Sequence, residues 1–155
     1  MKSYIRSLLA ASIFATGAAT AAPDASPGAV TPADPVLERA SQAIERKDWA
    51  AAAAALRDGL GQDPRKAEYH NLYAYALRNS PKPSMDLVFR HYNEALRLEP
   101  NHRGAHEYLG EAYLMVGNLA KAKEHLDVLD RLCTFGCDEY TMLKKAVAQF
   151  EAKKK

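Results

Sequence analysis

The stretch that decides the fold is HEYLGEAYLMVGNLAKAKEHL, residues 106–126. Its apolar residues recur at intervals of three and four positions on both sides of Gly117-Asn118, a pair that is typical of turns. No run of alternating β-branched residues interrupts this pattern. The stretch therefore predicts two helices joined by a short turn, a connection that favours antiparallel neighbours.

The same periodicity continues from Val36 toward the C-terminus, and turn or helix-ending residues divide it into segments of roughly 12 to 15 residues, a common helix length. The dividing points are Asp48, Asp63-Pro64, Ser80 to Ser84, Pro100-Asn101, Gly117-Asn118 and Gly136. We therefore expect seven helices and an all-α fold.

The sequence also repeats itself. The phrase LRDGLGQDPRKAEYHNLYAYALR (56–78) contains Pro64, and HYNEALRLEPNHRGAHEYLGEAY (91–113) contains Pro100, thirty-six residues later. The opening stretch has Leu109-Gly110 and Tyr113 before its turn and Ala122 and Leu126 after it, which resembles the tetratricopeptide repeat (TPR) signature W-x2-L-G-x2-Y, A-x3-F. His106 stands where that family usually has an aromatic residue.

The resemblance implies a TPR-like α-solenoid over residues 35–152. Its repeats would be 35–66, 67–102 and 103–136, with a capping helix at 138–152. Gly110 and Ala122 are expected to let the two helices of the third repeat approach closely. The second repeat departs from the family at Pro81 to Ser84, where two extra residues and two prolines lengthen its turn. In the atypical first repeat, Trp49 is expected to anchor the core over small residues, with ligand stacking as the alternative.

The N-terminus has the features of a secretory signal peptide. Lys2 and Arg6 precede an apolar run that is too short to cross a membrane, and small residues follow. We expect residues 1–21 to be removed by cleavage after Ala21, and the Pro/Ala-rich residues 22–34 to form a flexible leader. We therefore expect a periplasmic or secreted protein that has no membrane anchor after cleavage.

Charge and motif content exclude several classes of function. The chain has 21 Lys and Arg against 19 Asp and Glu, and removal of Lys2 and Arg6 would leave equal numbers with interspersed signs. Such a chain has no electrostatic footprint for nucleic acid. It also contains no nucleophile elbow and no Gly-rich phosphate loop, and His102 and His106 lack a third ligand partner. We expect neither an enzyme nor a cofactor.

The only two cysteines, Cys133 and Cys137, flank Gly136, which is expected to end one helix before Asp138 caps the next. Export favours a disulfide that staples this corner, contributing about 2 kcal/mol in the chain-entropy model. A thiol-disulfide or metal-handling accessory that uses the same two residues remains the alternative. The C-x-x-G-C corner also resembles one found in small exported TPR proteins of proteobacteria.

The family resemblance implies that the protein binds peptides in a concave groove, at the outward positions of the first helix in each repeat. These positions are Glu68, Asn71, Tyr75, Arg78, Asn79, Glu107, Glu111, Leu114 and Met115. They do not reproduce the Lys/Asn/Arg set with which chaperone-binding TPR domains clamp a carboxylate. The pair Glu107 and Glu111 could share a proton or hold a cation, or could simply face solvent or a partner.

We therefore expect a non-enzymatic exported adaptor that binds a protein or peptide segment during periplasmic assembly or maturation. A self-assembling structural protein is a further hypothesis, because exposed repeat ends can stack on one another.

Overall fold

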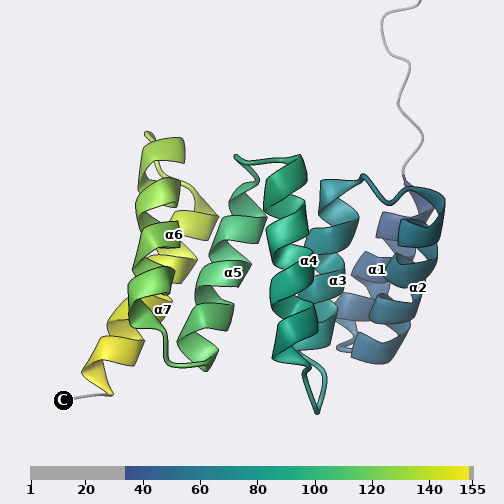
Figure 1. The fold of residues 1–155 in the computed structure, drawn as a ribbon, viewed down its shortest axis with the longest axis horizontal. Helices are drawn as coiled ribbons and strands as arrows, with labels where there is room; N and C mark the ends of the chain where they lie inside the picture. Colours follow the sequence, from purple (N-terminus) through teal and green to yellow (C-terminus); the bar gives the residue numbers. More distant parts are fainter. Residues whose placement is uncertain (1–33, 154–155) are drawn as a thin grey trace, which may run out of the picture. The chain divides into compact units, whose positions relative to one another are not determined.

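The computed structural model describes residues 34–153, and within them the chain forms seven helices and no strand. The helices are α1 (Pro35–Glu45), α2 (Trp49–Gln62), α3 (Ala67–Arg78), α4 (Met85–Leu98), α5 (Arg103–Met115), α6 (Leu119–Leu132) and α7 (Asp138–Ala152). They lie side by side as successive antiparallel pairs (Figure 1), which confirms the expected all-α solenoid. The predicted signal peptide and residues 22–33 of the predicted leader lie outside the described residues.

The outer two repeats use the same short turn between their helices. Three residues separate α1 from α2 and three separate α5 from α6. In each turn the middle residue has a positive φ, 57° at Lys47 and 80° at Gly117, and the next residue caps the following helix. The Oδ1 atom of Asp48 accepts a hydrogen bond from the Ala51 amide at 3.0 Å, and Asn118 makes the equivalent bond at 3.1 Å.

The middle repeat has a longer turn. Helix α4 begins 18 residues after the start of α3, whereas α6 begins 16 residues after the start of α5. The two-residue insertion expected at Pro81 to Ser84 is therefore present. It leaves the following helix unchanged in length, since α4 and α6 each have 14 residues.

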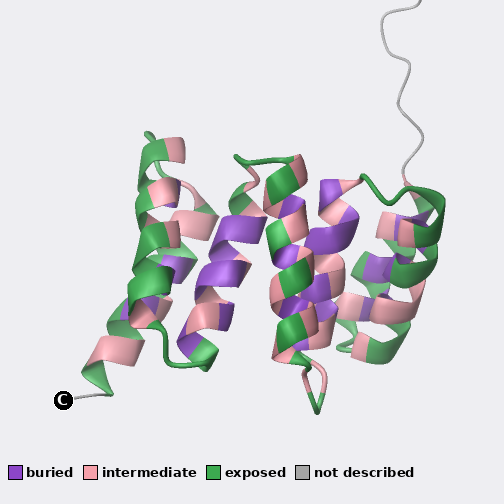
Figure 2. Ribbon diagram, viewed as in Figure 1, coloured by how far each residue is buried: buried purple, intermediate pink, exposed green. Residues whose placement is uncertain are grey.

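The two central first helices, α3 and α5, contain more buried residues than any other helix. Helices α3 and α5 each contain seven buried residues, whereas the other five helices contain two or three each (Figure 2). One core cluster joins α3, α4 and α5 through Tyr92 and Leu109, and another joins α5, α6 and α7 through Leu129 and Leu143. The solenoid is therefore held together through α3 and α5.

The capping helix takes the space left open at Gly110. A Cβ atom at Gly110 would lie 2.6 Å from Leu143 Cδ2. Leu143 belongs to α7, so Gly110 also gives room to the capping helix, a contact that the sequence did not predict. The reason is geometric, because residues of a first helix face the next first helix as well as their own partner.

Two residues at helix starts differ from the expectation. Asp34, expected in the flexible leader, caps α1 and also bonds Lys66 and the Tyr69 hydroxyl. The hydrogen bond from Lys66 holds the pKa of Asp34 well below its usual range. At α7 the cap is Cys137 rather than Asp138, since the Cys137 sulfur accepts from the Tyr140 amide.

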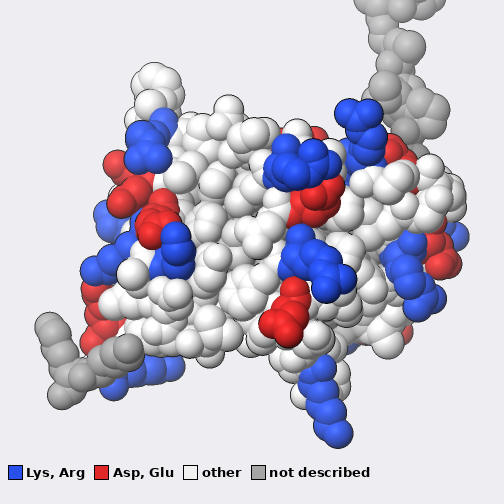
Figure 3. Space-filling model, in the orientation of Figure 1, with Lys and Arg blue, Asp and Glu red and all other residues white. Residues whose placement is uncertain are grey.

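Charged side chains of both signs are interspersed with uncharged surface on the face shown in Figure 3. No stripe of one sign follows a helix there, in keeping with the balanced charge count of the sequence. No helix in residues 34–153 combines the length and the apolar character needed to span a membrane.

Candidate functional site

The candidate site is a depression bounded by α3, α5 and α7. Its larger part has a volume of about 390 Å³ and its smaller part about 230 Å³, and the two parts share Glu111 and Ala146. The lining residues are Arg78, Asn79, Glu111, Leu114, Met115, Met142, Lys145, Ala146 and Gln149. We call this depression the α3–α5–α7 trough.

The trough contains some of the residues that the sequence assigned to the groove, and it adds others. Arg78, Asn79, Glu111, Leu114 and Met115 line it. Its far wall comes from α7, which the sequence had treated only as a cap. The missed signal was the regular spacing of α7, because a helix that continues the stack also continues the row of first helices.

Four predicted positions are buried rather than outward. They are Asn71, Arg78, Glu107 and Leu114. Each first helix is partly covered by the next one, so α5 covers positions on α3 and α7 covers positions on α5. Among the rest, Asn79 and Met115 are exposed, and Glu68, Tyr75 and Glu111 are half-buried.

Arg78, predicted as an outward groove residue, is held by the protein itself. Its guanidinium donates to Glu111 Oε2 at 2.7 Å and to the Tyr108 carbonyl at 3.1 Å. It also lies over the rings of Tyr75 and Tyr108, with centroid distances of 5.4 and 5.5 Å. The buried Arg78–Glu111 pair therefore forms a fixed part of the trough wall.

Glu107 is different, because it has no such partner. The residue is 7% exposed, and no described residue donates a hydrogen bond to its carboxylate or forms an ion pair with it. Burial, followed by the charges of Glu111 and Glu139, raises the pKa of Glu107 to about 7. The group is therefore near its titration midpoint at neutral pH.

No model of a known protein family matches this chain, and no curated protein matches it in sequence. Solved structures do match in shape. The TPR2B domain of yeast Sti1, solved as a pHsp70 complex, has a TM-score of 0.67 at 20% identity, with 76% of this chain and 94% of that chain covered. The protein has a TPR-like fold.

Two further structures agree with this. The first TPR domain of human RPAP3 has a TM-score of 0.66 at 19% identity, covering 77% of this chain and 91% of that chain. The Yersinia enterocolitica type III secretion chaperone SycD, solved with a peptide of the translocator YopD, has a TM-score of 0.64 at 14% identity, covering 77% and 92%. At 20% identity or less, these three structures show that the fold is shared.

Within the TPR-like fold, one histidine pair joins the helices of the second repeat. His70 on α3 and His91 on α4 place their Nδ1 atoms 2.8 Å apart, and His70 Nε2 lies 3.0 Å from the Pro64 carbonyl. Because a carbonyl only accepts, Nε2 of His70 must be the donor there. In the neutral pair, His91 then donates to His70 Nδ1.

The third repeat contains the same arrangement. His106 and His125 place their Nδ1 atoms 2.9 Å apart, and His106 Nε2 lies 2.9 Å from the Pro100 carbonyl. The sequence places His106 where TPR repeats usually have an aromatic residue, and its pairing with His125 was not predicted. The signal was present, since His70 and His106 are thirty-six residues apart and occupy the same position of successive repeats.

The second histidine of each pair is held in its neutral form. Burial, followed by the neighbouring histidine, lowers the pKa of His91 and of His125 to about 4. The geometry also excludes two protonated rings in one pair, because they would point two N–H groups at each other, and it leaves Nδ1 of the first histidine as the acceptor. Each pair therefore joins the two helices of its repeat through a hydrogen bond between neutral histidines.

His102 has the opposite environment. It caps α5, and its Nε2 atom lies 2.7 Å from Glu68 Oε2. The hydrogen bond with Glu68 raises the pKa of His102. This contact links the predicted groove residue Glu68 to the start of the next first helix.

Trp49 lines a second depression, away from the trough. Its ring meets Tyr75 edge-on, with centroids 5.9 Å apart, and it lines an apolar hollow of about 390 Å³ with Ala53, Ala76 and Pro81. Trp49 is half-buried, so it packs on small residues as expected while one side remains accessible.

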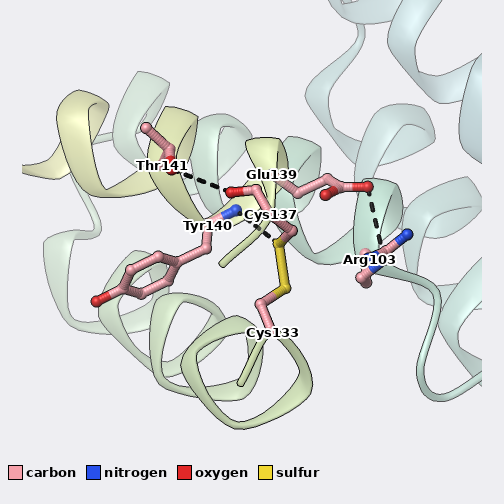
Figure 4. Close-up of a disulfide and its surroundings, with 6 residues drawn as sticks. All are labelled: Arg103, Cys133, Cys137, Glu139, Tyr140 and Thr141. Atoms are coloured by element: carbon pink, nitrogen blue, oxygen red, sulfur yellow. Dashed lines mark hydrogen bonds and ion pairs between the residues drawn. A yellow bond between two sulfur atoms is a disulfide. The ribbon is translucent and has the colours of Figure 1, made fainter. Parts of the chain in front are cut away.

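Cys133 and Cys137 form a disulfide at the corner between α6 and α7 (Figure 4), with their Cα atoms 5.6 Å apart. Gly136, expected to end α6, lies instead in the turn after it, because the helix ends at Leu132 with Cys133 as its C-cap; Gly136 has φ 85° and its amide donates to the Cys133 carbonyl at 2.8 Å. Glu139 lies beside the sulfur atoms and also pairs with Arg103 at 3.6 Å. In the oxidised form neither sulfur is a thiolate, so this group cannot bind a metal through its cysteines.

Proposed function

We propose that the protein is a non-enzymatic exported adaptor that binds a protein or peptide segment in the α3–α5–α7 trough and acts in periplasmic assembly or maturation. The observation that carries this proposal is the trough itself. It offers exposed apolar surface at Met115 and Met142, which are 57% and 53% exposed, beside a rigid polar wall formed by Arg78 and Glu111. Apolar anchors next to fixed polar groups are the usual means of holding a peptide.

The TPR-like neighbours support the proposal by analogy. The Sti1, RPAP3 and SycD families of structures include complexes with Hsp70, HSP90 and YopD peptides. At 20% identity or less they share the fold with this chain, and their own ligands are not transferred to it. What carries over is the general use of such a solenoid as a peptide receptor.

Photocrosslinking tests the proposal directly. A photoreactive residue replaces Met115 in the trough, and a matched control replaces Arg57 on α2, whose side chain is 70% exposed. We expect one partner to be captured in cells from position 115 and not from position 57. No capture at position 115, or equal capture at both positions, would contradict the proposed site.

Export requires its own test, because residues 1–33 lie outside the described part of the chain. We expect N-terminal sequencing of the protein from a periplasmic fraction to begin at Ala22. A protein that retains Met1 and fractionates with the cytoplasm would overturn the exported role and leave the trough proposal standing.

A thiol-disulfide accessory remains a second candidate because of one observation. The Cys137 sulfur occupies the N-cap of α7 and accepts a hydrogen bond from the Tyr140 amide at 3.4 Å. A helix N-terminus stabilises a thiolate, which would favour Cys137 as the leaving group during reduction. If a Cys133→Ser, Cys137→Ser variant with unchanged helical circular dichroism loses capture from position 115, this candidate replaces the adaptor.

A further inference from the structure

The second and third repeats place a buried acceptor at the same position. Asn71 on α3 and Glu107 on α5 are thirty-six residues apart, and they are 2% and 7% exposed. The Oδ1 atom of Asn71 has no hydrogen-bond partner among the described residues, and neither has the Glu107 carboxylate. Unpaired buried acceptors are uncommon, since each loses its hydration without compensation.

Of these two groups, Glu107 is the one that a ligand can reach. The Asn71 Oδ1 atom is fully buried, whereas the Glu107 carboxylate retains some exposure. Glu107 lies one helical turn before Glu111 on the same face of α5, and Glu111 lines both parts of the trough. Glu107 itself lines neither part of the trough, so its carboxylate lies beside the trough, beyond Glu111 and near the start of α7.

The charges around Glu107 are predominantly negative. Glu111 on its own helix and Asp138 and Glu139 on α7 act on it, with Arg78 on α3 as the opposing cation. Arg78 is paired with Glu111, and Arg103 is paired with Glu139. Both cations therefore pair with other carboxylates, and no described cation forms an ion pair with Glu107 itself.

We propose that Glu107 receives a lysine or arginine side chain of the segment bound in the trough, while Leu114 and Met115 contact an apolar residue next to it. The inference rests on the proposed function and adds the chemistry of the partner, a segment in which a basic residue adjoins an apolar one. A ligand cation would supply the hydrogen bonds and the charge that the buried carboxylate lacks.

The chain's own termini fit this site less well. Residues 22–33 contain no lysine or arginine, so the predicted leader offers no cation. Only the tail that begins at Lys153 is basic, and it follows the end of α7 whereas Glu107 faces the beginning of that helix. A separate partner is therefore the better occupant.

A positional-scanning library of end-blocked peptides of about seven residues tests the proposal, with the purified protein immobilised as the cell produces it. We expect enrichment of lysine or arginine at one position beside an apolar residue. Glu107→Gln, which keeps the size of the side chain, should abolish this cationic preference. Glu124→Gln, which removes the same charge from an exposed site on α6, should leave the preference unchanged.

Affinity for the selected peptide should also depend on pH, because only the ionised carboxylate attracts a cation. With the pKa of Glu107 raised to about 7, binding should be about tenfold tighter at pH 8 than at pH 6. The Glu107→Gln variant should bind equally at both values. A difference between pH 6 and pH 8 that survives Glu107→Gln would assign the titration to another group, such as His102, and contradict the proposal.

The experiment distinguishes a failure of the proposed function from a failure of this inference. Capture of no peptide would overturn both the proposed function and this inference. Capture without a preference for lysine or arginine, or with one that Glu107→Gln retains, would overturn the inference alone. A dimer in solution that Glu107→Gln dissociates would assign the basic tail of a second copy to the site, and would also overturn it.

Discussion

The second and third repeats share their internal contacts and differ where they face the trough. In each, a histidine of the first helix contacts a histidine of the second helix at 2.8 or 2.9 Å and a proline carbonyl at 3.0 or 2.9 Å. The residues that line the trough are Arg78 and Asn79 in one repeat and Glu111, Leu114 and Met115 in the other. Contacts within each helix pair thus maintain the fold, and recognition depends on the positions that differ.

Low pH should weaken the histidine pairs that the two repeats have in common. The pKa of His91 and His125 lies near 4 in the folded protein against an ordinary value of 6.5, so the unfolded chain binds more protons between these values. Stability should therefore fall as pH decreases from 6.5 to 4, by about 2 kcal/mol for each pair after allowance for solvent screening. Urea unfolding at a series of pH values measures this loss.

Substitution of one pair at a time sharpens the comparison. We expect His91→Gln and His125→Gln each to remove about half of the acid-dependent loss. His102→Gln is the control, because its raised pKa gives stability that is present below pH 6.5 and lost as pH rises through the folded value. If only one of the two substitutions changes the pH dependence of the free energy of unfolding, the two histidine pairs do not contribute equally to stability.

Gly110 should show that the third repeat depends on the capping helix. Gly110→Ala places a methyl group against Leu143 and should destabilise the protein by about 2 to 3 kcal/mol. Gly61→Ala is the matched control in α2, where no atom lies within 4 Å of the new Cβ. That change should stabilise by about 0.5 to 1 kcal/mol, since alanine favours the helix. Thermal unfolding of both variants shows whether each substitution raises or lowers stability. A change in the same direction for both would contradict the proposed packing.

Glu107 should be costly to stability when it is ionised. Its pKa of about 7 in the folded state exceeds the ordinary 4.5, so stability falls as pH rises through this range. Glu107→Gln should therefore stabilise the protein by about 1 to 2 kcal/mol at pH 8 and have little effect at pH 4. Denaturant unfolding at both values tests this, and a variant that is less stable at pH 8 would show that the carboxylate has a compensating partner.

The smallest effect is expected at Tyr92, which stands where the third repeat has Leu126. The Tyr92 hydroxyl is buried and has no hydrogen-bond partner among the described residues. Tyr92→Phe removes an unsatisfied group and keeps the ring, so the free energy of unfolding should change by less than about 0.5 kcal/mol or increase slightly. A clear loss of stability would mean that the hydroxyl is bonded in solution.

The fold could be predicted from the sequence because local signals were sufficient. Turn residues such as Gly117 and Gly136 mark the connections between helices, and apolar spacing gives the buried faces. The site was predicted less well because burial of Glu107 and engagement of Arg78 depend on which first helix covers the next. Positions in one repeat do not reveal that Leu143, more than thirty residues later, fills the space at Gly110.

The most direct test of the central claim is amide chemical-shift mapping of the protein during titration with the peptide that it selects from the library. The account predicts that the largest shifts occur at Asn79, Met115 and Ala146, on the three helices that line the trough. Shifts confined to the disulfide corner at Cys133 and Cys137, or to the outer helices α2, α4 and α6, would contradict it.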